Sequence, residues 1–114
     1  MEISRGDIVL VNLDPVIGSE QGKTRPALVI QNDIGNETSQ TTIIAPVTTK
    51  IYSKQFPTNV EIDSSNSPIK EKSTILLNQI RAIDKQRIMK SFGRISNKKM
   101  EEVNEAIRAS LGLD

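Results

Sequence analysis

The amino-acid sequence is divided into short runs of strand-forming residues, and each run is ended by a turn signal. The first run, Asp7 to Leu13, is rich in Val, Ile and Leu and stops at the Asp14-Pro15 pair. The second, Pro26 to Asn32, is apolar enough to be buried on both faces, and the polar stretch DIGNETSQ then breaks it. The pattern therefore predicts a sheet of short strands joined by loops.

Further strands are expected along the middle of the chain. Thr41 to Thr49 forms a third run, and Pro46 near its end must interrupt or bulge the ladder because proline has no N–H to donate. Thr58 to Ile62 alternates polar and apolar residues with the period of two that is typical of a half-buried strand. The remaining stretches are a long strand or bent pair over Ser73 to Ile83, a helical turn capped by Asp84, and a last strand over Ile88 to Ile95.

The C-terminal stretch has a helical period. Its apolar residues recur every three or four positions and define one face: Met100, Val103, Ile107 and Leu111, with Ala106 and Ser110 beside them. Ser96 is suited to cap the start of this helix, and Gly112 is suited to end it. The sequence therefore predicts a mainly β fold with α, in which one amphipathic helix packs on a small, strongly curved sheet or barrel.

The length of 114 residues predicts a single domain over 1–114, because one core typically serves about 100 to 150 residues. No apolar run approaches the roughly 20 residues that cross a bilayer, and the N-terminal MEISRGDIV lacks an apolar signal segment. We therefore expect a cytoplasmic protein with no membrane partner. Aromatic residues make up 3% of the chain, which predicts no stacking surface.

The formal net charge of +1 conceals an uneven distribution along the chain. Residues 1–49 hold three Lys and Arg against six Asp and Glu, residues 50–100 hold eleven against four, and residues 101–114 hold one against four. A basic middle segment favours a polyanionic partner. An ordinary solvated surface, over which folding distributes the basic and acidic segments evenly, explains the charge pattern equally well.

Histidine and cysteine are absent, which removes the Ser-His-Asp and Cys-His arrangements and the usual zinc ligands. Glu61 and Asp63 lie two apart on a predicted strand and share a face, but this common spacing favours a solvated edge over a Mg²⁺ site. We therefore expect no metal and no cofactor. The remaining groups are arginine, lysine, hydroxyls and amides, which suit the binding of phosphates.

Arg25 and Thr48 occupy matching places at strand ends. Pro26 restricts the backbone of Arg25 to extended conformations, so the guanidinium is presented from a stiff support. Judged by position alone, a structural ion pair between Arg25 and Glu20 or Asp7 is the better interpretation. Thr48 ends the third run, where a hydroxyl usually bonds the local backbone.

Several segments resemble the MazF/PemK toxins, which are sequence-specific, ribosome-independent mRNA endoribonucleases of toxin–antitoxin pairs. They are RGDIVLVNLDPVIGSEQGKTRPALVIQND, TTIIAPVTTK, TNVEID, TILLNQIRAIDKQR and MEEVNEAIRASLGL, and together they cover essentially the whole chain. The resemblance implies an SH3-like, plasmid-toxin-type barrel with a C-terminal helix, working as a homodimer whose interface groove receives RNA. It also implies that Arg25 and Thr48 are the catalytic pair.

The resemblance assigns further residues to single-stranded mRNA. Ser19, Glu20, Gln21 and Thr24 offer hydrogen-bonding groups for bases or backbone, and Gly18 and Gly22 allow their loop to close over the strand. The same groove is expected to contain four lower-ranked RNA-binding candidates: Asn32, Thr49, Ser53 and Gln79. Members this similar often cut U- and A-rich motifs such as UACAU.

The same groove is expected to bind the acidic tail of a MazE-like antitoxin. The candidate cations for that contact lie in the basic segment: Lys50, Lys54, Arg81, Lys85 and Arg87. Two alternatives stay open at this point. The chain could be a non-catalytic toxin of the same barrel class that binds DNA gyrase, or an SH3-like nucleic-acid-binding module. A metal-dependent nuclease using Glu61 and Asp63 ranks last.

Overall fold

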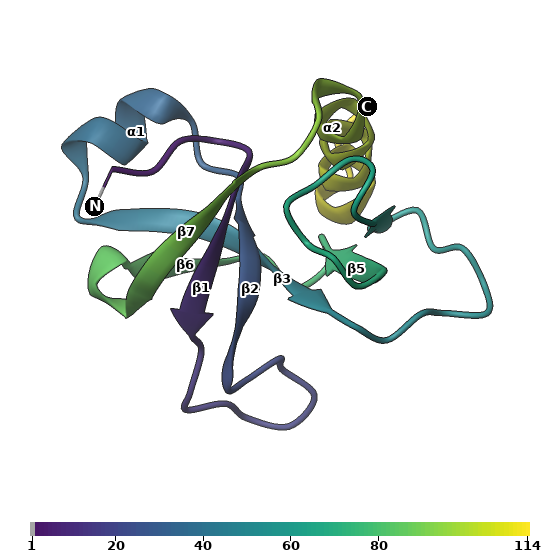
Figure 1. Cartoon of the computed structure of the whole chain (residues 1–114), viewed down its shortest axis with the longest axis horizontal. Coiled ribbons are helices and arrows are strands. Elements are labelled where there is room, and N and C mark those ends of the chain that lie inside the picture. The colour runs from purple at the N-terminus through teal and green to yellow at the C-terminus, as the bar shows by residue number, and fades with distance from the viewer. Residues whose placement is uncertain (1) are drawn as a thin grey trace.

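Seven short antiparallel strands and two helices make up the computed structural model, which describes residues 2–114 (Figure 1). In chain order they are β1 (Asp7–Asn12), β2 (Thr24–Val29), α1 (Asp33–Thr38), β3 (Thr41–Thr48), β4 (Asn59–Ile62), β5 (Ser73–Leu76), β6 (Arg81–Asp84), one helical turn (Lys85–Arg87), β7 (Ile88–Arg94) and α2 (Asn97–Leu111). The mainly β fold with a C-terminal helix is thus confirmed.

β3 is the strand around which the sheet is organised. The strand order is β4-β5-β3-β2-β1-β7, and β6 also pairs with β3. Along one edge of β3, Thr41 to Ile44 pair with β6, and Val47 and Thr48 pair with β5. The change of partner falls at Pro46, which cannot donate a ladder hydrogen bond, so the interruption predicted there is confirmed. The long stretch from Ser73 is a bent pair, β5 and β6.

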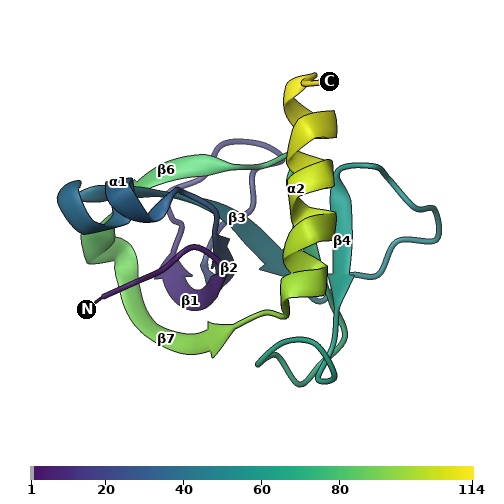
Figure 2. The same cartoon turned by 90° about the horizontal axis from the view of Figure 1, so that it is seen from above.

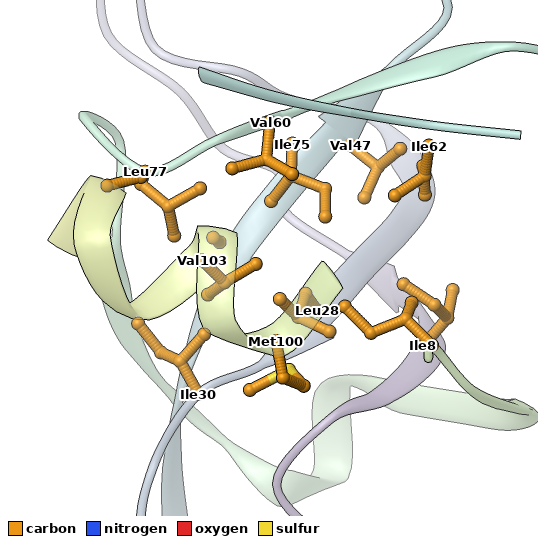
Figure 3. Packing of buried hydrophobic residues seen from close by; sticks show 13 residues of the cluster. Ile8, Leu28, Ile30, Val47, Val60, Ile62, Ile75, Leu77, Met100 and Val103 are labelled. Atoms are coloured by element: carbon orange, nitrogen blue, oxygen red, sulfur yellow. The ribbon is translucent and has the colours of Figure 1, made fainter. Parts of the chain in front are cut away.

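The central strands are buried on both faces and feed two separate hydrophobic clusters. Ile8 and Leu28 point to one cluster, while Val9 and Val29, one position along, point to the other. The first cluster also receives side chains from β4, β5 and α2, as Figure 3 shows. The second includes Ile83 of β6, and Ile88 of β7 packs against it. Two-sided burial explains why the second run reads as continuously apolar.

α2 covers the first cluster and crosses beside β4 (Figure 2). The Ser96 hydroxyl accepts a hydrogen bond from the Lys99 N–H at 3.1 Å, and Gly112 ends the helix with φ 71°, so both predicted caps are confirmed. Met100 and Val103 are buried as expected. Leu111 is 54% exposed, because the last turn of the helix extends beyond the sheet.

The stretch DIGNETSQ ends the second strand as predicted, but it also forms a helix that the sequence pattern did not predict. Residues Asp33–Thr38 form α1, whose N-cap is Asn32. The Asn32 side chain accepts a hydrogen bond from the Gly35 N–H at 2.8 Å. Asn36 is buried and accepts a hydrogen bond from the Thr42 hydroxyl. This contact and the cap offset the poor helix propensity of the segment.

Two smaller features complete the description. Asp84 caps the turn over Lys85–Arg87 by accepting the Gln86 N–H at 2.8 Å, which confirms that prediction. Within residues 2–114, no helix combines the length and the apolar character that spanning a membrane requires.

Leu28→Ala should destabilise the fold more than any surface truncation of the same size. Leu28 is fully buried in the first cluster, and Leu→Ala changes at such sites cost about 2 to 5 kcal/mol because a cavity remains. Leu113→Ala, at a residue that is 56% exposed, is the matched control. Urea unfolding measures both, and equal midpoints for the two variants would contradict this account of the core.

Candidate active site

Arg25 and Thr48 lie on neighbouring strands, where β2 begins and β3 ends. The two strands pair with Ala27 opposite Pro46. Extending this register by two residues places Arg25 opposite Thr48, on the face of the sheet that carries Ala27 and Pro46. Strand pairing therefore brings together two residues that are distant in the sequence.

The Arg25 guanidinium is half-buried and held by backbone carbonyls. Its Nε donates to the Gly22 carbonyl at 2.7 Å, and Nη1 reaches the Val47 carbonyl at 3.5 Å. Among residues 2–114 it forms no ion pair, and Glu20 and Asp7 accept backbone N–H groups instead. The structural ion pair considered for Arg25 is therefore wrong. The positive charge is oriented but not neutralised.

Thr48 has a hydroxyl proton to donate. Its Oγ1 accepts the Lys50 N–H at 3.2 Å, which fixes the side chain without using the proton. Thr48 faces Thr74 on β5, and Thr74 Oγ1 donates to the Lys50 carbonyl at 2.9 Å. The end of β3 is thus held from both sides.

The loop from 13 to 23 between β1 and β2 has defined internal contacts. Gly18 takes φ 58°, a conformation that favours glycine, and a Cβ on Gly22 would come within 2.5 Å of a Val16 side-chain carbon. Lys23, with φ 64°, is held by its N–H to Asp14 Oδ1 at 2.7 Å. These contacts fix the path of the loop between Asp14 and Lys23.

A cavity of about 420 Å³ lies between this loop and the turn joining β5 to β6. Three predicted RNA-binding residues of the loop and Gln79 from the turn line it together, and the Gln21 N–H donates to Gln79 Oε1 at 2.8 Å. The complete lining is Ser19, Glu20, Gln21, Pro46, Asn78, Gln79, Ile80 and Arg81. Because Pro46 shares a sheet face with Arg25 and Thr48, the cavity borders the catalytic candidates.

The other predicted RNA-binding residues are distributed around this group. Thr24 is exposed at the start of β2, next to Arg25. Thr49 and Ser53 are exposed in the loop that follows Thr48. Asn32 lies apart, because it follows the opposite end of β2 and its side chain caps α1.

Three of the candidate cations already contact backbone carbonyls. Arg81 donates to the Leu13 carbonyl at 3.3 Å, and Arg87 donates to the carbonyls of Asn12 and Asp14 at 3.0 and 2.7 Å. Lys85 bonds the Asn36 carbonyl. These residues support the β1–β2 loop and α1, while Lys50 and Lys54 lie in the exposed loop after β3.

The acidic pair that was weighed as a metal site has other partners. Glu61 pairs with Lys72 at 3.5 Å. Hydrogen bonds from the Ser65 hydroxyl and N–H hold the pKa of Asp63 below its ordinary value, as expected for a carboxylate that organises a turn. Within the described part of the chain, no three acidic side chains gather closely enough to share a cation.

Sequence reasoning missed Asn78 and the two aromatic residues of the loop after Thr48. Asn78 lines the cavity with Gln79 and Arg81, and its signal was adjacency to Gln79 in a turn-forming stretch. Tyr52 and Phe56, two of three aromatic residues in the chain, lie edge to face. Counting aromatic residues over the whole chain hid this local pair.

The fold and site define a small barrel-type protein in which an arginine and a hydroxyl, set beside a polar cavity, are suited to a phosphate ester. The chain matches the model of the PemK-like, MazF-like toxin of type II toxin–antitoxin systems over residues 4–111, and it belongs to that family.

Two relatives are similar over nearly their full lengths. Endoribonuclease EndoA of Bacillus subtilis is 48% identical over 113 residues, which are 99% of this chain and 97% of the relative. Endoribonuclease MazF of Staphylococcus saprophyticus is 50% identical over 109 residues, covering 96% and 91% of the two chains. A solved endoribonuclease from a mycobacterial species, in complex with its cognate antitoxin, has the same fold, with a TM-score of 0.82, 20% identity and coverage of 98% and 97%.

Gln79→Ala should loosen the β1–β2 loop while the rest of the fold stays intact. The variant removes the acceptor of the Gln21 N–H. That amide should therefore exchange with deuterium about 5-fold faster, which corresponds to the loss of one hydrogen bond worth roughly 1 kcal/mol. Asn78→Ala, at the exposed neighbouring position, should leave this exchange unchanged. Equal protection of Gln21 in all three proteins would show that the bond does not order the loop.

Proposed function

We propose that this chain is an endoribonuclease toxin that cleaves single-stranded mRNA at a short motif, with Arg25 and Thr48 as its catalytic residues. The observation that carries the proposal is the antiparallel register of β2 and β3. It places a guanidinium without an ion-pair partner opposite a threonine hydroxyl, beside a cavity. Membership of the toxin family and two relatives named as endoribonucleases support the same activity.

The chemistry needs no nucleophile from the protein, because RNA carries a 2′-hydroxyl beside each phosphate. Attack by the 2′-oxygen forms a bond to phosphorus, and the bond from phosphorus to the 5′-oxygen breaks. The net proton movement is from the 2′-hydroxyl to the departing 5′-oxygen, which leaves as a 5′-hydroxyl. Arg25 stabilises the charge that develops on the phosphate oxygens, and the Thr48 hydroxyl donates to the same group.

The cavity supplies groups that can read bases. Ser19 supplies a hydroxyl, Glu20 a carboxylate and Gln79 an amide. Together these groups offer both donors and acceptors to a base edge. Arg81 adds a positive charge at the same lining. Hydrogen bonds to Gln79 and to Asp14 support the loop in the conformation that lines the cavity.

We place the protein in a homodimer and expect a MazE-like antitoxin as its protein partner. The toxin–antitoxin family and the solved complex of a similarly folded endoribonuclease with its antitoxin support the antitoxin as partner. Lys50 and Lys54 are the exposed cations next to the site that suit an acidic antitoxin segment.

Arg25→Ala and Thr48→Val should each lower kcat/KM for RNA cleavage by at least about 100-fold, as the loss of one group that stabilises an oxyanion does. Fluorogenic single-stranded RNA measures the rate. Arg108→Ala on α2 and Thr41→Val at the other end of β3 are matched controls that should cleave normally. Undiminished cleavage by Arg25→Ala would remove the catalytic assignment.

Cleavage should proceed in excess EDTA and should leave 5′-hydroxyl ends. Mapping the ends produced on a long defined RNA reports the motif and the terminal chemistry together. RNA ends with a 5′-phosphate would contradict attack by the 2′-oxygen, and inhibition by EDTA would favour a metal-dependent nuclease. Intact RNA that is nevertheless bound tightly would favour a non-catalytic binding module.

A further inference from the structure

The loop between β3 and β4 contains a cluster of two aromatic rings. Tyr52 and Phe56 are edge to face, with ring centroids 5.8 Å apart and an interplanar angle of 88°. This geometry is the favoured one for two rings in contact. Phe56 nevertheless stays 46% exposed, so an apolar ring surface faces solvent next to the end of β3. Burial in the core does not explain this pair.

The loop is anchored at both of its ends. The Lys50 N–H is held by Thr48 Oγ1 and the Lys50 carbonyl by Thr74 Oγ1, so the chain leaves β3 in a fixed direction. At the other end, the Asn59 N–H donates to the Phe56 carbonyl at 3.0 Å. The two rings are therefore presented from a supported backbone, a few residues from a catalytic candidate.

The aromatic pair borders the cavity of the candidate active site. Tyr52 and Phe56 line a second cavity of about 160 Å³. Asn78 and Gln79 line both this cavity and the larger one that contains Ser19, Glu20 and Gln21. The two hollows are thus adjacent, and a strand of RNA in the first would extend naturally into the second.

The charge around the rings suits a phosphate backbone. Lys50 Nζ lies 4.8 Å from the centroid of the Tyr52 ring. Lys54 lines a third cavity with both aromatic residues. The acidic residues of that third cavity are engaged by lysines, because Glu61 pairs with Lys72 at 3.5 Å and Glu102 pairs with Lys99 at 3.2 Å.

We propose that Tyr52 and Phe56 form a stacking subsite for one unpaired nucleobase of the RNA, with Lys50 and Lys54 contacting the flanking phosphates. The proposal rests on the proposed function, since it extends the same RNA-binding site. Rings and lysines that alternate along a supported loop are the elements by which proteins hold single-stranded nucleic acid.

The chain provides a built-in probe of this subsite. Tyr52 is its single tyrosine and tryptophan is absent, so intrinsic fluorescence reports on position 52 alone. We would titrate the wild-type protein with a single-stranded RNA of defined sequence that carries 2′-O-methyl groups and therefore cannot be cleaved by 2′-oxygen attack. The expected result is saturable quenching whose midpoint equals the Kd measured with end-labelled RNA.

Phe56→Leu tests the ring without changing the apolar character of the position. We expect about 10-fold weaker RNA binding, and a raised KM with a nearly unchanged kcat for unmodified RNA. Phe92→Leu is the matched control, because Phe92 is 36% exposed and has Lys90 Nζ 4.9 Å from its ring centroid, but it lies on β7 at the opposite edge of the sheet. One abasic position should weaken binding to the wild type and have a smaller effect in Phe56→Leu, in which only the Tyr52 ring remains for stacking.

The outcomes separate this proposal from the proposed function. Absence of cleavage of unmodified RNA by the wild type would refute the nuclease, while the binding titration would still decide the subsite. Three results would overturn the stacking subsite and leave the rings for a protein partner. They are RNA binding with unchanged Tyr52 fluorescence, equal losses of RNA affinity in Phe56→Leu and Phe92→Leu, and no RNA binding at all.

Discussion

The pairing of β3 with three other strands is the constraint on which the rest of the structure depends. β2 lies along one edge of β3, while β6 and β5 share the other edge and meet at Pro46. Proline cannot donate a ladder hydrogen bond, so this position tolerates the change of partner. The same register that seals two hydrophobic clusters also determines which side chains face each other where β3 ends.

The candidate active site is a product of that register. Arg25 faces Thr48 because their strands are antiparallel and paired through Ala27 and Pro46. Backbone carbonyls orient the guanidinium, and the Gln21–Gln79 hydrogen bond fixes the loop that closes the neighbouring cavity. Most of the site is thus positioned by hydrogen bonds to or from main-chain groups.

The aromatic pair adds a different kind of contact to this site. Hydrogen-bonding groups in the larger cavity can discriminate among bases, whereas a ring face binds any base. Stacking of a base next to these hydrogen-bonding groups would add affinity for RNA without altering the sequence motif that is recognised. A protein with three aromatic residues gains this surface only because two of them lie in one anchored loop.

The sequence by itself determined the strands, the C-terminal helix with its caps, and the kind of chemistry, because each of these depends on neighbouring residues and on which side chains are present. It missed α1, whose stability comes from the Asn32 cap and the buried Asn36. It also favoured an ion pair for Arg25 that is not formed. Only the tertiary structure decided that Arg25 lies opposite Thr48, that the Gln21 N–H bonds Gln79 and that two aromatic rings pack together. These contacts depend on register and on long-range pairing, which local periodicity does not encode.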